Sequence, residues 1–197
     1  MRKLILSMLV SADGFMAGPD GDLEWFLTDD ELEQEMLGVL RSVDLILLGR
    51  VSYELLAAYW PTAGTPAAGE APGGFTSSER EIEFARLMNT IPKVVFSRTL
   101  ERADWGPVTI EREVDAEEIA RLKQQPGKDL VLFAGAKIAA GFAELDLFDE
   151  YHLLVHPVVL GGGIPMFDGG TARRELKLRR TRTFRSGVVV LQYLRNP

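Results

Sequence analysis

The sequence contains no cysteine among its 197 residues. Disulfide bonds, thiolate zinc sites and a cysteine nucleophile are therefore excluded. Histidine is scarce as well, with His152 and His156 alone, and two histidines without a neighbouring acid pair make a poor metal site. We expect no metal. Long apolar runs are also missing: no stretch approaches the roughly 18 residues of a membrane span, so we expect no membrane partner.

A surplus of positive charge is absent too, since the net charge is −7. A nucleic-acid-binding protein would need a basic footprint, and the one dense candidate is RRELKLRRTRTFR, residues 173–185. Apolar Leu176 and Leu178 alternate there with Lys177 and Arg179, which is typical of a strand with a solvated basic face. We therefore expect no nucleic-acid partner, and an anionic ligand must be held by local groups.

The first ten residues, MRKLILSMLV, have a basic pair and a short apolar run, as secretory signals do. SADGF follows at once in place of a small-residue cleavage site. We therefore interpret residues 3–10 as a strand covered on both faces and expect a cytoplasmic protein.

Strand and helix patterns alternate up to about residue 148, and strands dominate after it. This order predicts an α/β fold with a mainly parallel central sheet, helices on both faces and a C-terminal antiparallel hairpin. Strands are expected at 3–10, 44–49, 93–97, 107–112, 129–134, 150–159, 175–184 and 187–195, and helices at 28–43 (with Thr28 as N-cap), 50–60, 78–91, 115–125 and 136–146.

The most loop-like segment is PTAGTPAAGEAPGGFTSS, residues 61–78. It could be a domain linker, but neither flank is long enough for an independent domain. We predict a single domain over residues 1–197, with this segment as a surface excursion.

Distinctive residues follow the predicted parallel strands, where ligands bind in open α/β sheets. The segments are SADGFMAG after the first strand, GRVSYE after the second, SRT after the third and AGAKI before the fifth helix. Gly135 in AGAKI could let a pyrophosphate approach a helix N-terminus, or it could simply serve a tight turn. The segment lacks the G-x-G-x-x-G order, which argues against a Rossmann site. Arginine and hydroxyl residues in GRVS and SRT shift the interpretation toward a phosphorylated nucleotide.

In their order and spacing, the segments SADGFMAG, LEW, LLGRVSYE, VVFSRT, LFAGAKI and HPVVLGGGIPMF resemble the dihydrofolate reductase superfamily. Within it, the chain is most similar to stand-alone proteins like the reductase domain of riboflavin biosynthesis. The resemblance covers nearly the whole chain and implies the three-layer dihydrofolate reductase-like fold, NADPH as the cofactor and a homodimer.

The resemblance also implies cofactor contacts. GRVS matches the phosphate-binding segment, SR the strand end that faces the adenosine 2′-phosphate, GAKI the pyrophosphate turn, and MAG the loop along the nicotinamide. In the pyrophosphate turn, an alanine stands where the family more often has a second glycine. The implied residues are Met16, Ala17, Gly18, Gly49, Arg50, Ser52, Ser97, Arg98, Gly135, Ala136, Lys137 and Ile138.

Substrate residues are implied with alternatives left open. Asp13 matches an acid near the site of hydride transfer and is the candidate catalytic residue, delivering the proton itself or through a water that it holds. Asp-Gly after a strand is also an ordinary turn, in which the carboxylate would only cap backbone amides. Folate reductases carry their essential acid on the first helix after a tryptophan, a region where this chain has Trp25, Asp29 and Asp30; the two acids also suit an ordinary helix N-terminus. The predicted substrate-contacting residues are Trp25, Tyr53, Gly162 and Gly163; Tyr53, with Tyr59 and Trp60, fits either a planar substrate or core packing.

Together these features predict an NADPH-dependent reductase of a small heterocyclic or ribosylamino-pyrimidine or pterin-type substrate. Its nearest activity would be 5-amino-6-(5-phosphoribosylamino)uracil reduction. The sequence has no H-x-E or P-C-x-x-C deaminase segment and no recognisable phosphoribosyl-binding arginines. The alternatives are a dihydrofolate or pteridine reductase, and a non-catalytic nucleotide-binding oligomer on the same fold.

Overall fold

The computed structural model describes residues 1–63, 65, 78–133, 135–167 and 172–196. Most of the loop-like segment 61–78 and the end of the glycine-rich segment 161–170 lie outside these residues, as does Ala134. The prediction of a surface excursion at 61–78 therefore concerns residues that are largely not described.

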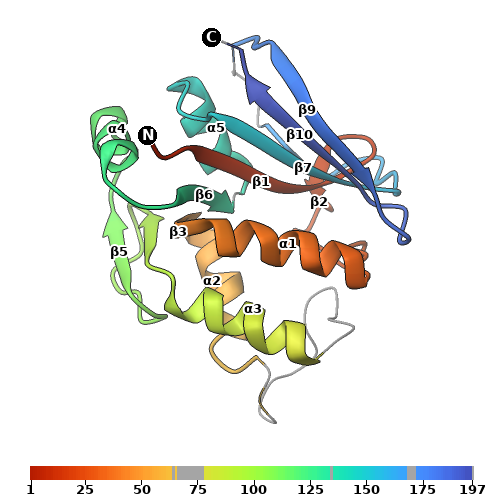
Figure 1. The fold of residues 1–197 in the computed structure, drawn as a ribbon, viewed down its shortest axis with the longest axis horizontal. Helices are drawn as coiled ribbons and strands as arrows, with labels where there is room; N and C mark the ends of the chain where they lie inside the picture. The colour runs from red at the N-terminus through yellow and green to blue at the C-terminus, as the bar shows by residue number, and fades with distance from the viewer. Residues whose placement is uncertain (64, 66–77, 134, 168–171, 197) are drawn as a thin grey trace.

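An eight-stranded sheet forms the centre of the fold, in the order β5-β4-β3-β6-β1-β7-β10-β9 (Figure 1). Neighbouring strands are parallel along β5, β4, β3, β6, β1 and β7. Strand β10 is antiparallel to both β7 and β9. The predicted C-terminal hairpin is thus confirmed. The strands are β1 (Leu4–Ser11), β3 (Val43–Gly49), β4 (Lys93–Phe96), β5 (Val108–Glu111), β6 (Asp129–Phe133), β7 (Glu150–His156), β9 (Leu176–Thr183) and β10 (Val189–Arg195).

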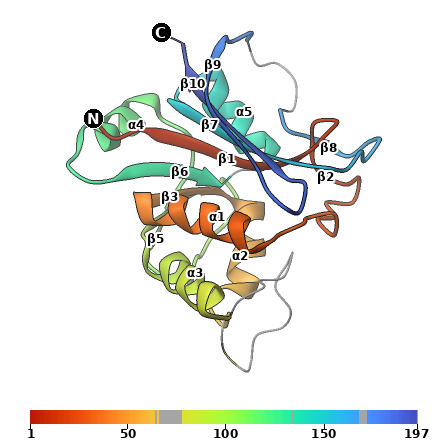
Figure 2. The same ribbon diagram turned by 45° about the vertical axis from the view of Figure 1, so that its right-hand side comes forward.

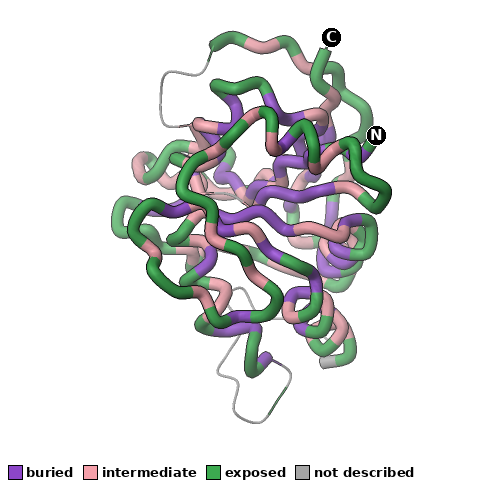
Figure 3. The backbone as a smooth tube through the Cα atoms, turned by 90° about the vertical axis from the view of Figure 1, so that its left-hand side faces the viewer, coloured by how far each residue is buried: buried purple, intermediate pink, exposed green. Residues whose placement is uncertain are grey.

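Helices cover both faces of the sheet, as the alternation of elements predicts (Figure 1). Because side chains alternate along a strand, Ile46 and Leu48 join a core with α1, α2 and α3, while Leu47 between them joins a second core with α4 and α5. The buried central strands lie between these layers in Figure 3. The helices are α1 (Asp30–Ser42), α2 (Arg50–Tyr59), α3 (Ser78–Thr90), α4 (Ala116–Gln124) and α5 (Ala136–Glu144).

The start of α1 corrects the predicted N-cap, because Asp29 rather than Thr28 caps the helix. Its carboxylate accepts hydrogen bonds from the amides of Glu31 at 3.0 Å and Leu32 at 2.9 Å. The second carboxylate oxygen accepts from the amide of Ser186 at 2.6 Å, in the turn between β9 and β10. One aspartate therefore joins α1 to the hairpin, a contact that local spacing does not reveal.

Two short strands were not predicted. β2 (Phe15–Ala17) and β8 (Ile164–Pro165) form a separate antiparallel pair, and they lie side by side in Figure 2. They lie in glycine-rich segments that have no strand periodicity, and their pairing exists because two loops distant in the sequence meet.

Strand β9 also differs from the prediction. Its Arg180 and Arg182 are not simply solvated but pair with Glu35 and Glu31 of α1.

Candidate active site

Three of the predicted phosphate-binding segments meet at one edge of the sheet. Strands β4, β3 and β6 are neighbours, with Gly49 paired to Phe96 and Leu48 to Phe133. Because all three are parallel, their carboxyl ends lie together, and the segments that follow them are brought into one place.

The N-termini of α2 and α5 lie against each other at this edge. Their N-caps, Gly49 and Gly135, have no side-chain hydrogen bond to the first-turn amides. A methyl group added at Gly49 would lie 3.1 Å from Cγ2 of Ile138, and one added at Gly135 would lie 3.7 Å from the Ser52 hydroxyl. Two uncapped helix ends side by side offer unpaired N–H groups and a positive dipole potential to an anion.

The charged groups around this edge differ in their availability. Arg50 forms an exposed i,i+4 ion pair with Glu54 at 2.8 Å, a type of pair that contributes little to stability. The Ser97 hydroxyl accepts from the amides of Thr99 and Leu100, so it first of all forms a turn. Arg98 is exposed, and its guanidinium has no hydrogen bond or ion pair within the described part of the chain. Arg98 is therefore free to meet an added phosphate.

The loop with the predicted nicotinamide residues Met16, Ala17 and Gly18 contains β2 and is held in place by β8. Gly163 has φ +138°, and a methyl group on it would lie 2.2 Å from the Ala17 carbonyl oxygen. Packing against this loop explains why Gly163 must be glycine. Gly162, by contrast, has open space around it.

Asp13 joins the same two loops. Its carboxylate accepts from the Ser11 hydroxyl at 2.7 Å and from the amides of Leu160 and Gly161 at 3.1 and 2.8 Å. The hydrogen bond from Ser11, together with those from the amides, holds the pKa of Asp13 below its usual value. These hydrogen bonds tie the loop after β1 to the loop before β8.

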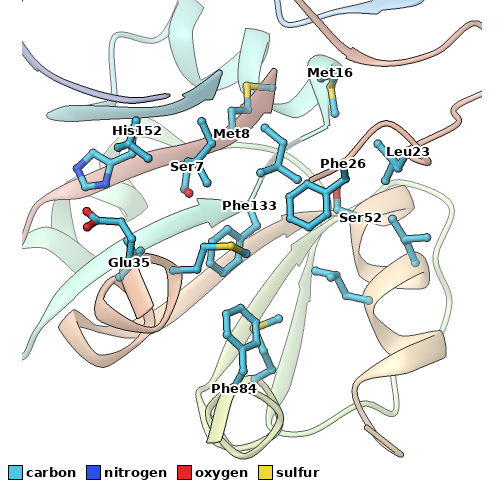
Figure 4. A pocket seen from close by; sticks show the side chains of 18 of the residues that line it. Ser7, Met8, Met16, Leu23, Phe26, Glu35, Ser52, Phe84, Phe133 and His152 are labelled. Atoms are coloured by element: carbon cyan, nitrogen blue, oxygen red, sulfur yellow. The ribbon is translucent and has the colours of Figure 1, made fainter. Parts of the chain in front are cut away.

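A cavity of about 250 Å³ begins beside this edge and extends beneath β1 between α1, α2 and β10 (Figure 4). Met16 and Ser52, both predicted as cofactor residues, line it, and so the helix ends and the cavity form one continuous site. Its apolar wall consists of Met8, Leu9, Leu23, Phe26, Met36, Val39, Leu55, Leu56, Tyr59, Trp60, Phe84, Met88, Phe133, Leu154 and Val190.

Polar side chains gather at one end of the cavity: Ser7 of β1, Glu35 of α1, His152 of β7 and Gln192 of β10. In Figure 4 the Glu35 carboxylate and the Ser7 hydroxyl lie near the His152 ring. Glu35 accepts from Arg180 at 2.7 Å and from the Gln192 amide at 3.3 Å. These are residues that sequence reasoning missed. The spacing of Glu35 from Met36 and Val39 on one helix face was the one available signal.

Several predicted substrate residues lie outside the cavity. Tyr53 is buried in the core, where its hydroxyl accepts from the Trp105 amide at 2.9 Å, a position that agrees with the core-packing alternative. Trp25 donates to the Asp22 carbonyl and packs on His156 with ring centroids 5.2 Å apart, while the adjacent Phe26 lines the cavity. Asp29 caps α1, and Asp30 pairs with Arg80.

The architecture and the site define the class first: this is a dihydrofolate reductase-like α/β protein. Dihydrofolate reductase from Enterococcus faecalis, complexed with NADP(H), superposes with a TM-score of 0.56 at 15% identity, covering 99% of this chain and 97% of that one. The family follows from the sequence, which matches the RibD C-terminal domain over residues 2–190. The chain belongs to that family.

Other relatives agree with this assignment. The uncharacterized protein YyaP of Bacillus subtilis is 37% identical over 98% of this chain and 94% of its own length. A putative riboflavin biosynthesis protein from Shewanella has a TM-score of 0.74 at 18% identity, with 99% of both chains covered. The diaminohydroxyphosphoribosylaminopyrimidine deaminase/5-amino-6-(5-phosphoribosylamino)uracil reductase of Thermotoga maritima has a TM-score of 0.65 at 16% identity, covering 99% of this chain and 57% of that one.

Two further features concern membranes and metals. Among the described residues, no helix is long and apolar enough to cross a bilayer. The same residues contain no cluster of three or more acids and histidines that could hold a metal ion.

Proposed function

We propose that this protein is an NADPH-dependent reductase that transfers a hydride to a C=N or C=O group of a small planar substrate. The observation that carries the proposal is the junction at Ser52, where two uncapped helix N-termini adjoin a largely apolar cavity. The reductases among the structural relatives, one of them complexed with NADP(H), support the same reaction class.

The residues at the sheet edge fit such a cofactor. The amides after Gly49 and Gly135 would hold its pyrophosphate, with Arg50 able to exchange Glu54 for phosphate oxygens. Arg98 would meet the 2′-phosphate, which favours NADPH over NADH. When bound, the cofactor supplies the hydride. Met16 lines the cavity on the side of the β2 loop and would orient the reacting ring.

The proton route is a separate proposal. Asp13 was predicted to deliver the proton directly or through water, but its carboxylate accepts several hydrogen bonds and its lowered pKa opposes proton donation at neutral pH. We propose that Asp13 positions the β2 and β8 loops. The water-excluding apolar wall would protect the hydride transfer from solvent.

Pteridine reduction is the second candidate. Glu35 favours it, because it places a carboxylate of the first helix in the cavity, whereas Asp29 and Asp30 do not line it. Glu35 would then face the ring nitrogens of a pterin.

Binding of NADPH tests the central proposal. NADPH at millimolar concentration should raise the melting temperature more than NADH does. Arg98→Ala should weaken NADPH binding about tenfold or more and leave NADH binding almost unchanged, because a charge-assisted hydrogen bond contributes about 1.5–3 kcal/mol. Arg102→Ala is the matched control, since Arg102 is also exposed but pairs with Asp104. If NADPH produces no thermal shift, the reductase proposal fails and the non-catalytic alternative stands.

We also propose that two copies associate through the C-terminal hairpin. Strand β9 is the last strand in the sheet order, which leaves one edge of it unpaired in the described structure. Leu178 on this strand is 51% exposed, so the hairpin offers an edge and an apolar side chain to a second copy.

A further inference from the structure

His152 has a buried nitrogen without a partner. The residue is 7% exposed, and its Nδ1 has no hydrogen bond in the described structure. Its other nitrogen, Nε2, lies 3.1 Å from Oε2 of Glu150. An unpaired buried polar atom is uncommon in folded proteins. Because His152 also lines the cavity, a ligand in the cavity is a candidate partner for its Nδ1.

Glu150 determines which nitrogen is unpaired. It is 3% exposed, and its Oε1 accepts from Lys3 at 2.6 Å and from Arg179 at 2.7 Å. Burial alone would raise the pKa of Glu150, but the hydrogen bonds from Lys3 and His152 outweigh burial and lower it. A carboxylate accepts only, so Nε2 of His152 must carry the proton that it donates. Nδ1 of the neutral ring is then a lone-pair acceptor.

The neighbours of His152 extend this acceptor into a recognition edge. The Glu35 carboxylate, whose oxygens already accept from Arg180, Arg182 and Gln192, retains further lone pairs beside it. The Ser7 hydroxyl, which has no hydrogen bond to a described residue, can donate or accept. Figure 4 shows all three side chains at the same end of the cavity. Such an edge suits a planar ring that presents N–H or O–H donors side by side.

The remaining wall gives no support to a phosphate. No lysine or arginine lines the cavity in the part of the chain that the structure describes, and none occurs among residues 64, 66–77, 134, 168–171 and 197. A second hollow shares Glu35, His152 and Gln192 with the cavity. In the described structure four arginines line it, Arg41, Arg80, Arg180 and Arg182, and each already pairs with a carboxylate. The volume of about 250 Å³ lies just below the range of about 300–1,000 Å³ that is usual for small-molecule sites.

We infer that the cavity binds a neutral, unphosphorylated one- or two-ring heterocycle, oriented by a donor on its edge that hydrogen-bonds to Nδ1 of His152. We therefore expect 5-amino-6-(5-phosphoribosylamino)uracil, the compound in the name of the Thermotoga maritima enzyme, to bind poorly in this cavity. That this heterocycle is a substrate rests on the proposed reductase function, but its binding does not.

Calorimetric titration tests the inference with pterin, 5,6-diaminouracil and 2-quinolone as unphosphorylated probes, and 5-amino-6-(5-phosphoribosylamino)uracil as the phosphorylated one. At least one unphosphorylated probe should bind at least tenfold more tightly than the phosphorylated compound. His152→Phe should weaken that probe at least tenfold. His156→Phe is the matched control, because His156 is also buried on the same face of β7 but does not line the cavity. Within the described structure, its ring touches the lining only through Phe26, so His156→Phe should weaken the probe much less than His152→Phe does.

Three results would overturn the inference: no binding of any unphosphorylated probe at millimolar concentration, equal or tighter binding of the phosphorylated one, or an unchanged affinity in a folded His152→Phe variant. The NADPH thermal shift is measured in parallel on each variant. If NADPH does not raise the melting temperature of the wild-type protein while the probes bind as expected, the reductase proposal is rejected and the ligand inference is left intact.

Discussion

His156 shows how strongly burial acts on a single side chain. It is fully buried beside Trp25 and Phe26, and its Nε2 has no partner in the described structure. Burial lowers its pKa to about 4. The folded protein therefore holds His156 neutral, whereas the unfolded chain takes up a proton near pH 6.5.

Stability should consequently decrease in mildly acidic solution. A histidine whose pKa is lower in the folded state contributes fully above the unfolded pKa, and this contribution is lost as the pH falls from about 6.5 toward 4. Between pH 7 and 4.5 we expect a loss of about 2–3 kcal/mol from His156, with His152 acting in the same direction because burial lowers its pKa too. Urea unfolding of the wild type and of His156→Phe at several pH values measures this change in the free energy of unfolding. Equal pH slopes for the two proteins would contradict the assignment.

For single residues of the candidate site, the sequence predicted some of those that follow a strand. Ser52 was predicted from its position after a strand and Met16 from the family resemblance, and both line the cavity. Apart from the spacing of Glu35 from Met36 and Val39, nothing marks Glu35 or Gln192 in the sequence, because each is an ordinary polar residue on its own element. Their proximity arises from the packing of α1 against the hairpin, and no local pattern encodes that contact.

At the scale of elements, the pairing of β2 with β8 fixes the loop beside the cavity. A side chain at position 163 would collide with the Ala17 carbonyl oxygen, and its φ of +138° suits glycine. The two strands would have to separate to accept any other residue.

Gly163→Ala should therefore destabilise the protein by about 2 kcal/mol or more, since both the collision and the backbone conformation oppose alanine. Gly162→Ala is the matched control. A methyl group there has nothing within 4 Å, so its effect should stay within about 1 kcal/mol. Chemical denaturation of both variants decides the matter, and equal stabilities would show that the β2–β8 contact is not as close as described.

Most long elements could be predicted because their apolar periodicity is intrinsic to them. The α1 to α5 spans and the sheet strands agree with prediction to within a few residues. The pair β2 and β8 could not, because glycine-rich loops have no periodic signal and gain their strand conformation from each other.

At the scale of the whole molecule, the proposed association through the hairpin β9–β10 can be tested by a single charge. We expect Leu178→Glu to convert a dimer to a monomer, because it places charge on an exposed apolar position of the edge strand. Sedimentation velocity of the wild type and the variant provides the measurement. Thr181→Glu, on the same exposed strand, controls for added charge. A monomeric wild type, or a dimeric Leu178→Glu variant, would exclude this interface.

The central position of β1 has a consequence for biosynthesis. This strand pairs with β6 and β7, whose residues begin at 129 and 150, so a growing polypeptide exposes an apolar strand long before its partners are translated. Nascent chains with such unpaired edges are prone to aggregation and need protection. Gln192 of β10, which is translated near the end of the chain, completes the polar end of the cavity. A small molecule that fits the cavity therefore stabilises the folded protein but does not protect the nascent chain, in which the cavity has not yet formed.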